Sequence, residues 1–222
     1  MKHLLLLVWM ALQVGIAPIP ASVRAPEPGE SIQLSVQPLR QSKITSCGPA
    51  VLAMAYQYAY PSAGISEHEI LAYAERQGWY TETKYPYTSP ANMLNIVRHY
   101  TENFLSGQVH SSQQGLELLA RELRRGNPII IDALVRLEDR ASGAHFVLVT
   151  GLSVAPDNRF AVTLTYLDPL IGEEKRAPYY GEAGLWNAWY RNGDPGGAGW
   201  WMVIPVPLPL DMPLRLGEYL AI

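Results

Sequence analysis

The sequence predicts an α+β domain in which N-terminal helices pack on an antiparallel β-sheet. Helical spacing of apolar residues dominates residues 48–126, whereas short β-rich runs separated by turn residues follow from residue 128. Helices first and strands afterwards are typical of an antiparallel sheet with its helices segregated. A chain of 222 residues, 48% of them hydrophobic, is long enough to bury the core of one such domain.

Four helices are predicted, each from apolar residues at helical spacing and from end signals. Ser66 followed by Glu69 is a capping box, and Pro49 suits a first helical turn. Gly126 is typical of a helix end. The predicted helices run from Gly48 to Ala59, from Ser66 to about Gly78, from Ser89 through Tyr100, and through Leu116 to Gly126.

Four strands are predicted from runs rich in β-branched and aromatic residues. They cover residues 128–137, 144–154, 160–167 and 200–207. Prolines at 205, 207, 209 and 213 favour an extended C-terminal segment. Residues 172–199, rich in Gly, Tyr and Trp, receive no assignment.

Composition and charge exclude several classes of protein. Charged residues make up 17% of the chain and the net charge is −3, so the sequence indicates neither a disordered chain nor a basic face for nucleic acid. The single cysteine excludes an intrachain disulfide and a Cys-rich zinc site, and the five histidines form no HExxH motif. We therefore expect no metal, no cofactor and no nucleic-acid partner.

The first residues predict a secretory signal peptide. A basic start, Met1-Lys2-His3, precedes an apolar run to Ala17, and small residues and prolines follow up to Ala21. The run is shorter than the about 20 residues that span a bilayer. A buried helix is the alternative, disfavoured by the prolines. We expect a secreted or periplasmic protein, with the signal either cleaved or kept as a membrane anchor. The expected parts are a signal peptide, a linker and the folded domain, at residues 1–21, 22–31 and 32–222.

Cys47 lies at the start of the first predicted helix. Backbone N–H groups and the helix dipole favour an anion there, which suits a reactive thiolate. The alternative is a buried structural cysteine that behaves as a small hydrophobe. A catalytic role needs a base close to the thiol.

His145 and Asp168 occupy the far ends of two predicted strands joined by the turn Ala155-Pro156-Asp157-Asn158. A symmetric hairpin about this turn places His145 directly opposite Asp168, with Cβ atoms about 5 Å apart. The carboxylate could then hold one imidazole nitrogen and leave the other for the thiol. Alternatively, both are ordinary strand-end residues, and a slip of one position would separate them.

Gln41 lies six positions before Cys47. Its amide, together with the Cys47 backbone N–H, would give two donors for the oxyanion of a tetrahedral intermediate. A solvated loop glutamine is the alternative, and Gln37 is a rival for the role.

These residues carry a resemblance to a known family. The block from Gln41 through Cys47-Gly48-Pro49-Ala50 resembles the active-site start of the bacteriocin-processing, double-glycine leader peptidases, which are papain-like cysteine peptidases. The segments Gly126-Asn-Pro-Ile-Ile-Ile and Gly143-Ala-His145-Phe-Val-Leu-Val-Thr-Gly151 are similar to the two strands of that family around its histidine, and Asp168-Pro169 to its aspartate.

The resemblance implies a papain-like α+β fold and peptide-bond cleavage through a thioester, without metal or cofactor. It implies Cys47 as nucleophile, His145 as general base and acid, Asp168 as the residue that orients His145, and Gln41 as oxyanion donor. The chain lacks a GxxxxGK[ST] motif and a second long apolar run, unlike the transporter-linked members, so the leader substrate does not carry over.

Other candidates have less support. Asp157 lies in the turn itself, and Asp132 lies within an apolar strand with no evident role. The cluster Ser66-Glu67-His68-Glu69 is interpreted as a capped, solvated helix start. The tryptophans are interpreted as core, with a ligand groove as the alternative.

We therefore expect an exported thiol hydrolase that acts on a peptide or protein substrate. Two alternatives stay open: acyl transfer of the transglutaminase or amidase type, and a peptide-binding module without catalysis.

Overall fold

The computed structural model describes residues 24–207. Its helices are α1 (Cys47–Ala59), α2 (Glu67–Arg76), α3 (Pro90–Tyr100), α4 (Ser112–Arg124) and α5 (Leu185–Tyr190), with short 3-10 turns η1 (Pro61–Ala63) and η2 (Arg140–Ser142). Its strands are β1 (Ser31–Gln33), β2 (Leu105–Gln108), β3 (Ile129–Leu134), β4 (Ala144–Ala155), β5 (Asn158–Asp168), β6 (Glu173–Pro178) and β7 (Trp200–Val203). The predicted α+β fold is confirmed.

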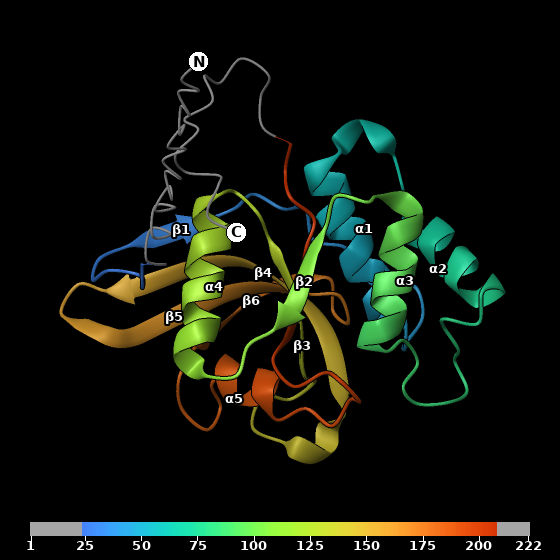
Figure 1. Cartoon of the computed structure of the whole chain (residues 1–222). Helices are drawn as coiled ribbons and strands as arrows, with labels where there is room; N and C mark the ends of the chain where they lie inside the picture. Colours follow the sequence, from blue (N-terminus) through green and yellow to red (C-terminus); the bar gives the residue numbers. More distant parts are fainter. Residues whose placement is uncertain (1–23, 208–222) are drawn as a thin grey trace, which may run out of the picture. The chain divides into compact units, whose positions relative to one another are not determined.

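The strands form one antiparallel sheet in the order β2-β7-β3-β4-β5-β6, and β1 pairs with β4 outside this row. Helices α1, α2 and α3 gather at one side of the sheet, and α4 and α5 lie at the other (Figure 1). Each side has its own hydrophobic core.

Strand β3 explains how the sheet serves both cores. Ile129 and Ile131 belong to the core of α4 and α5, whereas Ile130 belongs to the core of α1, α2 and α3. Side chains alternate along a strand, so a strand covered on both faces reads as a continuous apolar run. Complete burial of each isoleucine contributes about 1.5–3 kcal/mol to folding. Asp132 interrupts this run and is fully buried.

The four predicted helices are confirmed, with their ends within a few residues of the predicted ones. The first and last predicted strands are shorter in the structure, ending at Leu134 and Val203. Pro205 lacks an N–H group, which limits any continuation of β7. The structure contains four elements that were not predicted, β1, β2, β6 and α5, which are three to six residues long. Such short elements show too few periods to be recognised.

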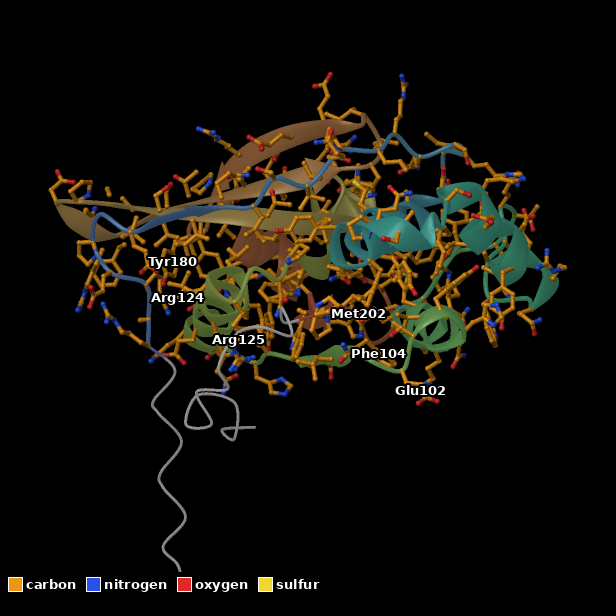
Figure 2. All side chains as sticks on the ribbon, turned by 90° about the horizontal axis from the view of Figure 1, so that it is seen from above. Glu102, Phe104, Arg124, Arg125, Tyr180 and Met202 are labelled. Atoms are coloured by element: carbon orange, nitrogen blue, oxygen red, sulfur yellow. The ribbon has the colours of Figure 1, made fainter. Side chains whose placement is uncertain are left out.

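The predicted signal peptide lies outside the described residues, and so does the C-terminal segment from residue 208. Part of the expected linker contacts the domain. The Arg124 guanidinium donates to the carbonyls of Arg24 and Ala25 and to both carboxylate oxygens of Glu30. Figure 2 shows Arg124 at the end of α4, where the first described segment approaches. Residues 24–31 are therefore held against α4, and β1 begins within the range expected for the linker.

Candidate active site

Cys47 is the first residue of α1 and is half-buried. Ser46 is the N-cap, but its hydroxyl makes no cap hydrogen bond to the helix. The amides of a first helical turn have no acceptor within the helix. The positive end of α1 therefore faces the thiol without a side-chain cap, as the sequence predicted for the position of Cys47.

His145 and Asp168 form a buried pair, with Nε2 of His145 2.7 Å from Oδ1 of Asp168. An ionised carboxylate only accepts hydrogen bonds, so Nε2 carries the hydrogen and donates. Asp168 also accepts from the backbone N–H of Leu170 at 3.0 Å and from Nζ of Lys175 at 2.9 Å. Burial alone would raise the pKa of Asp168, but His145 and Lys175 hold it well below its usual range.

The register that brings these residues together differs from the predicted one. Leu148 pairs with Leu167, so continuing the register places Asp168 opposite Val147 rather than His145. The predicted direct opposition was wrong because two bulges, near Gly151 and Ala155, shift the strands. Val147 and His145 share one face of β4, so the contact is diagonal, and both side chains can reach across.

Cys47 completes the cluster. Cys47 is close enough to His145 to affect its pKa, and since Nε2 is engaged with Asp168, Nδ1 is the nitrogen available to sulfur. Burial lowers the pKa of His145, but the hydrogen bond with Asp168 and the proximity of Cys47 outweigh it and raise the pKa to about 9. Imidazolium is therefore the favoured form at neutral pH. A thiol beside an imidazolium that a carboxylate orients is the arrangement of thiol nucleophilic catalysis.

Gln41 is buried beside this cluster, and its backbone N–H donates to the Pro169 carbonyl at 2.8 Å. Its Nε2 donates to the carbonyls of Lys43 and Ile44, both at 2.8 Å. Both amide hydrogens of Gln41 are therefore engaged with carbonyls, so an oxyanion would have to replace one of the two carbonyls as acceptor. The structure thus places Gln41 at the start of the loop that precedes Cys47, with its amide donors directed into that loop.

Comparison with protein-family models shows a match to the Peptidase_C39-like family over residues 33–195. The match covers most of the chain and includes Gln41, Cys47, His145 and Asp168. The chain belongs to the Peptidase_C39-like family. The resemblance noted in the sequence is confirmed, and membership indicates a cysteine peptidase-like protein with a papain-like fold. A comparison with curated proteins found no match.

Lys175 was not among the predicted site residues, because the segment that forms β6 received no assignment. Glu173 pairs with Asp168 in the β5–β6 ladder, so Lys175 lies two residues along the same face. The charged sequence of β6 gives no period-2 apolar signal.

The cluster at the start of α2 was only partly understood from sequence. The capping box of Ser66 and Glu69 is present as predicted. Glu67, expected in solvent, is 6% exposed instead. Its carboxylate accepts hydrogen bonds from Ser42 and Ser46 in the loop that precedes Cys47, which the sequence did not indicate.

Asp132 is close enough to Cys47 and His145 to interact with both electrostatically. Burial and the neighbouring Asp194 raise the pKa of Asp132 well above its usual range. Asp157 is exposed in the β4–β5 turn, away from the cluster. The tryptophans contribute to the cores: Trp189 and Trp200 are buried, and Trp186 and Trp201 pack against buried residues.

Within residues 24–207, no three His, Cys, Asp or Glu side chains converge as metal ligands. No helix in this range is both long and apolar enough to cross a membrane. A surface groove of about 630 Å³ between α3 and β2 contains none of the clustered catalytic candidates.

Proposed function

We propose that this protein is an exported thiol hydrolase that cleaves peptide or amide bonds through Cys47, His145 and Asp168. The observation that carries the proposal is the orientation of His145: Asp168 holds Nε2, which leaves the opposite side of the ring to the Cys47 thiol. Membership of a peptidase-like family supports the same chemistry. The N-terminal sequence supports export.

In the proposed acylation, the Cys47 thiolate attacks the substrate carbonyl carbon. The carbonyl oxygen becomes an oxyanion beside the Cys47 backbone N–H, with Gln41 as second donor once it exchanges a loop carbonyl for the oxyanion. The His145 imidazolium gives its proton to the leaving nitrogen as the C–N bond breaks. A thioester on Cys47 and a free amine result.

In the proposed deacylation, neutral His145 takes a proton from a water molecule as its oxygen attacks the thioester carbon. The C–S bond breaks, the carboxylic acid product leaves, and the thiolate–imidazolium pair is restored. Asp168 keeps the ring oriented in both steps and stabilises its charged form.

The test is the pH profile of Cys47 alkylation by iodoacetamide, measured for the wild type, for His145→Ala and for His110→Ala. His110 is an exposed histidine and serves as the matched control. We expect the wild type and His110→Ala to be alkylated at about pH 5–6, and His145→Ala to lose this reactivity. A wild-type thiol that reacts only above about pH 8 would contradict the thiolate–imidazolium pair and favour a non-catalytic binding module.

A further inference from the structure

Glu67 is a buried carboxylate that the proposed mechanism does not use. It is the first residue of α2, and the positive end of that helix favours its charge. Within the described residues 24–207, all of the hydrogen bonds that its side chain accepts come from the loop immediately before Cys47. The Ser42 backbone N–H donates to both oxygens at 3.0 Å, the Ser42 hydroxyl at 3.0 Å and the Ser46 hydroxyl at 2.7 Å.

The bond with Ser46 affects the start of α1. Ser66, Ser89 and Ser111 are the N-caps of α2, α3 and α4, and each accepts a backbone N–H of its own helix. Ser46, the N-cap of α1, does not. The third residue of α1 is Pro49, which has no N–H for a cap to accept, and the Ser46 hydroxyl instead contacts the Glu67 carboxylate at 2.7 Å and the Lys43 carbonyl at 3.0 Å. The contact with Glu67 therefore holds the residue directly before the Cys47 backbone N–H.

The hydrogen bonds between Glu67 and Ser42 affect the second oxyanion donor, the Gln41 side-chain amide. Ser42 follows Gln41, and the carbonyls that hold the Gln41 amide belong to Lys43 and Ile44 in the same loop. The Glu67 carboxylate hydrogen-bonds with both ends of this loop. It therefore fixes the two groups that would donate to an oxyanion, the Cys47 backbone N–H and the Gln41 amide. Charge-assisted hydrogen bonds of this kind are about twice as strong as neutral ones.

We propose that Glu67 is a positioning residue that sets the oxyanion donors by anchoring the loop from Ser42 to Ser46. The proposal rests on the proposed function. Within residues 24–207, the Glu67 carboxylate hydrogen-bonds with Ser42 and Ser46 and not with Cys47, so it acts through this loop. Its removal should slow acyl transfer, in which an oxyanion forms, and spare alkylation, in which none forms.

The test compares two reagents on Glu67→Gln, with Glu69→Gln as the matched control. Glu69 lies two residues along the same helix, is exposed, and a glutamine there still completes a capping box. With p-nitrophenyl acetate, the Cys47 sulfur bonds to the acetyl carbon and p-nitrophenolate leaves. With iodoacetamide, sulfur displaces iodide without an oxyanion. Mass spectrometry assigns both modifications to Cys47.

We expect Cys47 of Glu67→Gln to be acylated at a rate about tenfold or more below that of the wild type. This loss is smaller than the one found when an oxyanion donor is itself deleted, because both donors are still present. Its iodoacetamide pH profile should be unchanged, and Glu69→Gln should match the wild type with both reagents. Acylation of Glu67→Gln at the wild-type rate would overturn the proposal. An equal loss with both reagents would also overturn it, because it would indicate general disruption.

A second variant covers the case in which Glu67→Gln does not fold. Ser42→Ala deletes one hydroxyl donor and leaves the buried charge with its other partners. We expect a smaller loss, again confined to acylation, and acylation at the wild-type rate would count against the proposal. If the wild-type Cys47 reacts selectively with neither reagent, the proposed function fails, and this inference fails with it.

Discussion

Nε2 of His145 lies 2.7 Å from Oδ1 of Asp168, although the register of β4 and β5 places Asp168 opposite Val147. Two bulges shift the hairpin without moving either side chain to the other face. The contact therefore depends on the face of the sheet and on side-chain reach rather than on direct pairing. Both residues are buried, which strengthens the charge interaction between them.

The pKa of His145 predicts the alkaline limit of activity. His145 must be protonated to give a proton to the leaving group, and its pKa is about 9. We expect hydrolysis of a peptide substrate to fall with a midpoint near pH 9 as imidazolium is lost. The measurement is kcat/KM across pH 5–10. An alkaline midpoint near 6.5, the ordinary histidine value, would contradict the proposed pair.

Asp168→Asn should move that limit to lower pH. The carboxylate raises the pKa of His145, so a neutral amide leaves the imidazolium less stable. We also expect kcat/KM to fall about 10²-fold or more, because the ring loses its orienting partner. The measurement is the same pH profile, and an unchanged midpoint would show that Asp168 does not control the charge of His145.

Lys175→Met is expected to have a smaller effect. Lys175 contacts the Asp168 carboxylate but its side chain is 40% exposed, so solvent screens the ion pair. We expect a loss of less than about 1 kcal/mol in the free energy of unfolding and a change in kcat/KM of a few-fold at most. Urea denaturation and steady-state kinetics test this. A loss as large as that of Asp168→Asn would make Lys175 an essential partner.

Asp132→Asn should stabilise the protein at neutral pH. Asp132 is fully buried and faces Asp194, and neither of its oxygens has a hydrogen-bond donor within residues 24–207. A folded-state pKa above the unfolded value means that stability falls as pH rises above about 4, because only the unfolded chain releases the proton. We expect the asparagine amide to donate to the neighbouring Asp194 carboxylate, and an amide does not ionise.

The expected gain appears in melting temperatures measured at pH 4 and pH 7. A gain of about 1 kcal/mol corresponds to about 2–4 °C in a protein of this size. The gain should be larger at pH 7 than at pH 4. A variant that is less stable than the wild type at pH 7 would show that the Asp132 carboxyl group itself supports the fold.

Gly115→Ala tests the close approach of α4 and α5. A Cβ at this position would lie 2.6 Å from the Tyr179 hydroxyl and 3.0 Å from the Trp186 ring. Alanine gains about 1 kcal/mol in helix propensity, but overpacking a core costs about 1–3 kcal/mol. We expect a net loss of up to about 2 kcal/mol in the free energy of unfolding, measured by urea denaturation. A stabilised variant would contradict the packing at this contact.

The sequence by itself was sufficient for the α+β class, the four longer helices and the position of Cys47 at a helix start. These features depend on local signals such as apolar periodicity, capping residues and Pro49 in a first turn. The family resemblance also followed from short local motifs, and the family match confirms it. The prediction that both His145 and Asp168 lie at the ends of their strands is likewise a local one.

Only the tertiary structure decided which side chains meet. The bulges in β4 and β5 changed the register, and β6 brought Lys175 to Asp168. The local pattern of α2 predicts an exposed Glu67. The structure instead buries it against Ser42 and Ser46, which lie more than 20 positions earlier in the chain. Such contacts depend on how the elements pack against one another. Residues far apart in the chain produce no periodic pattern in the sequence, so their contacts could not be predicted from it.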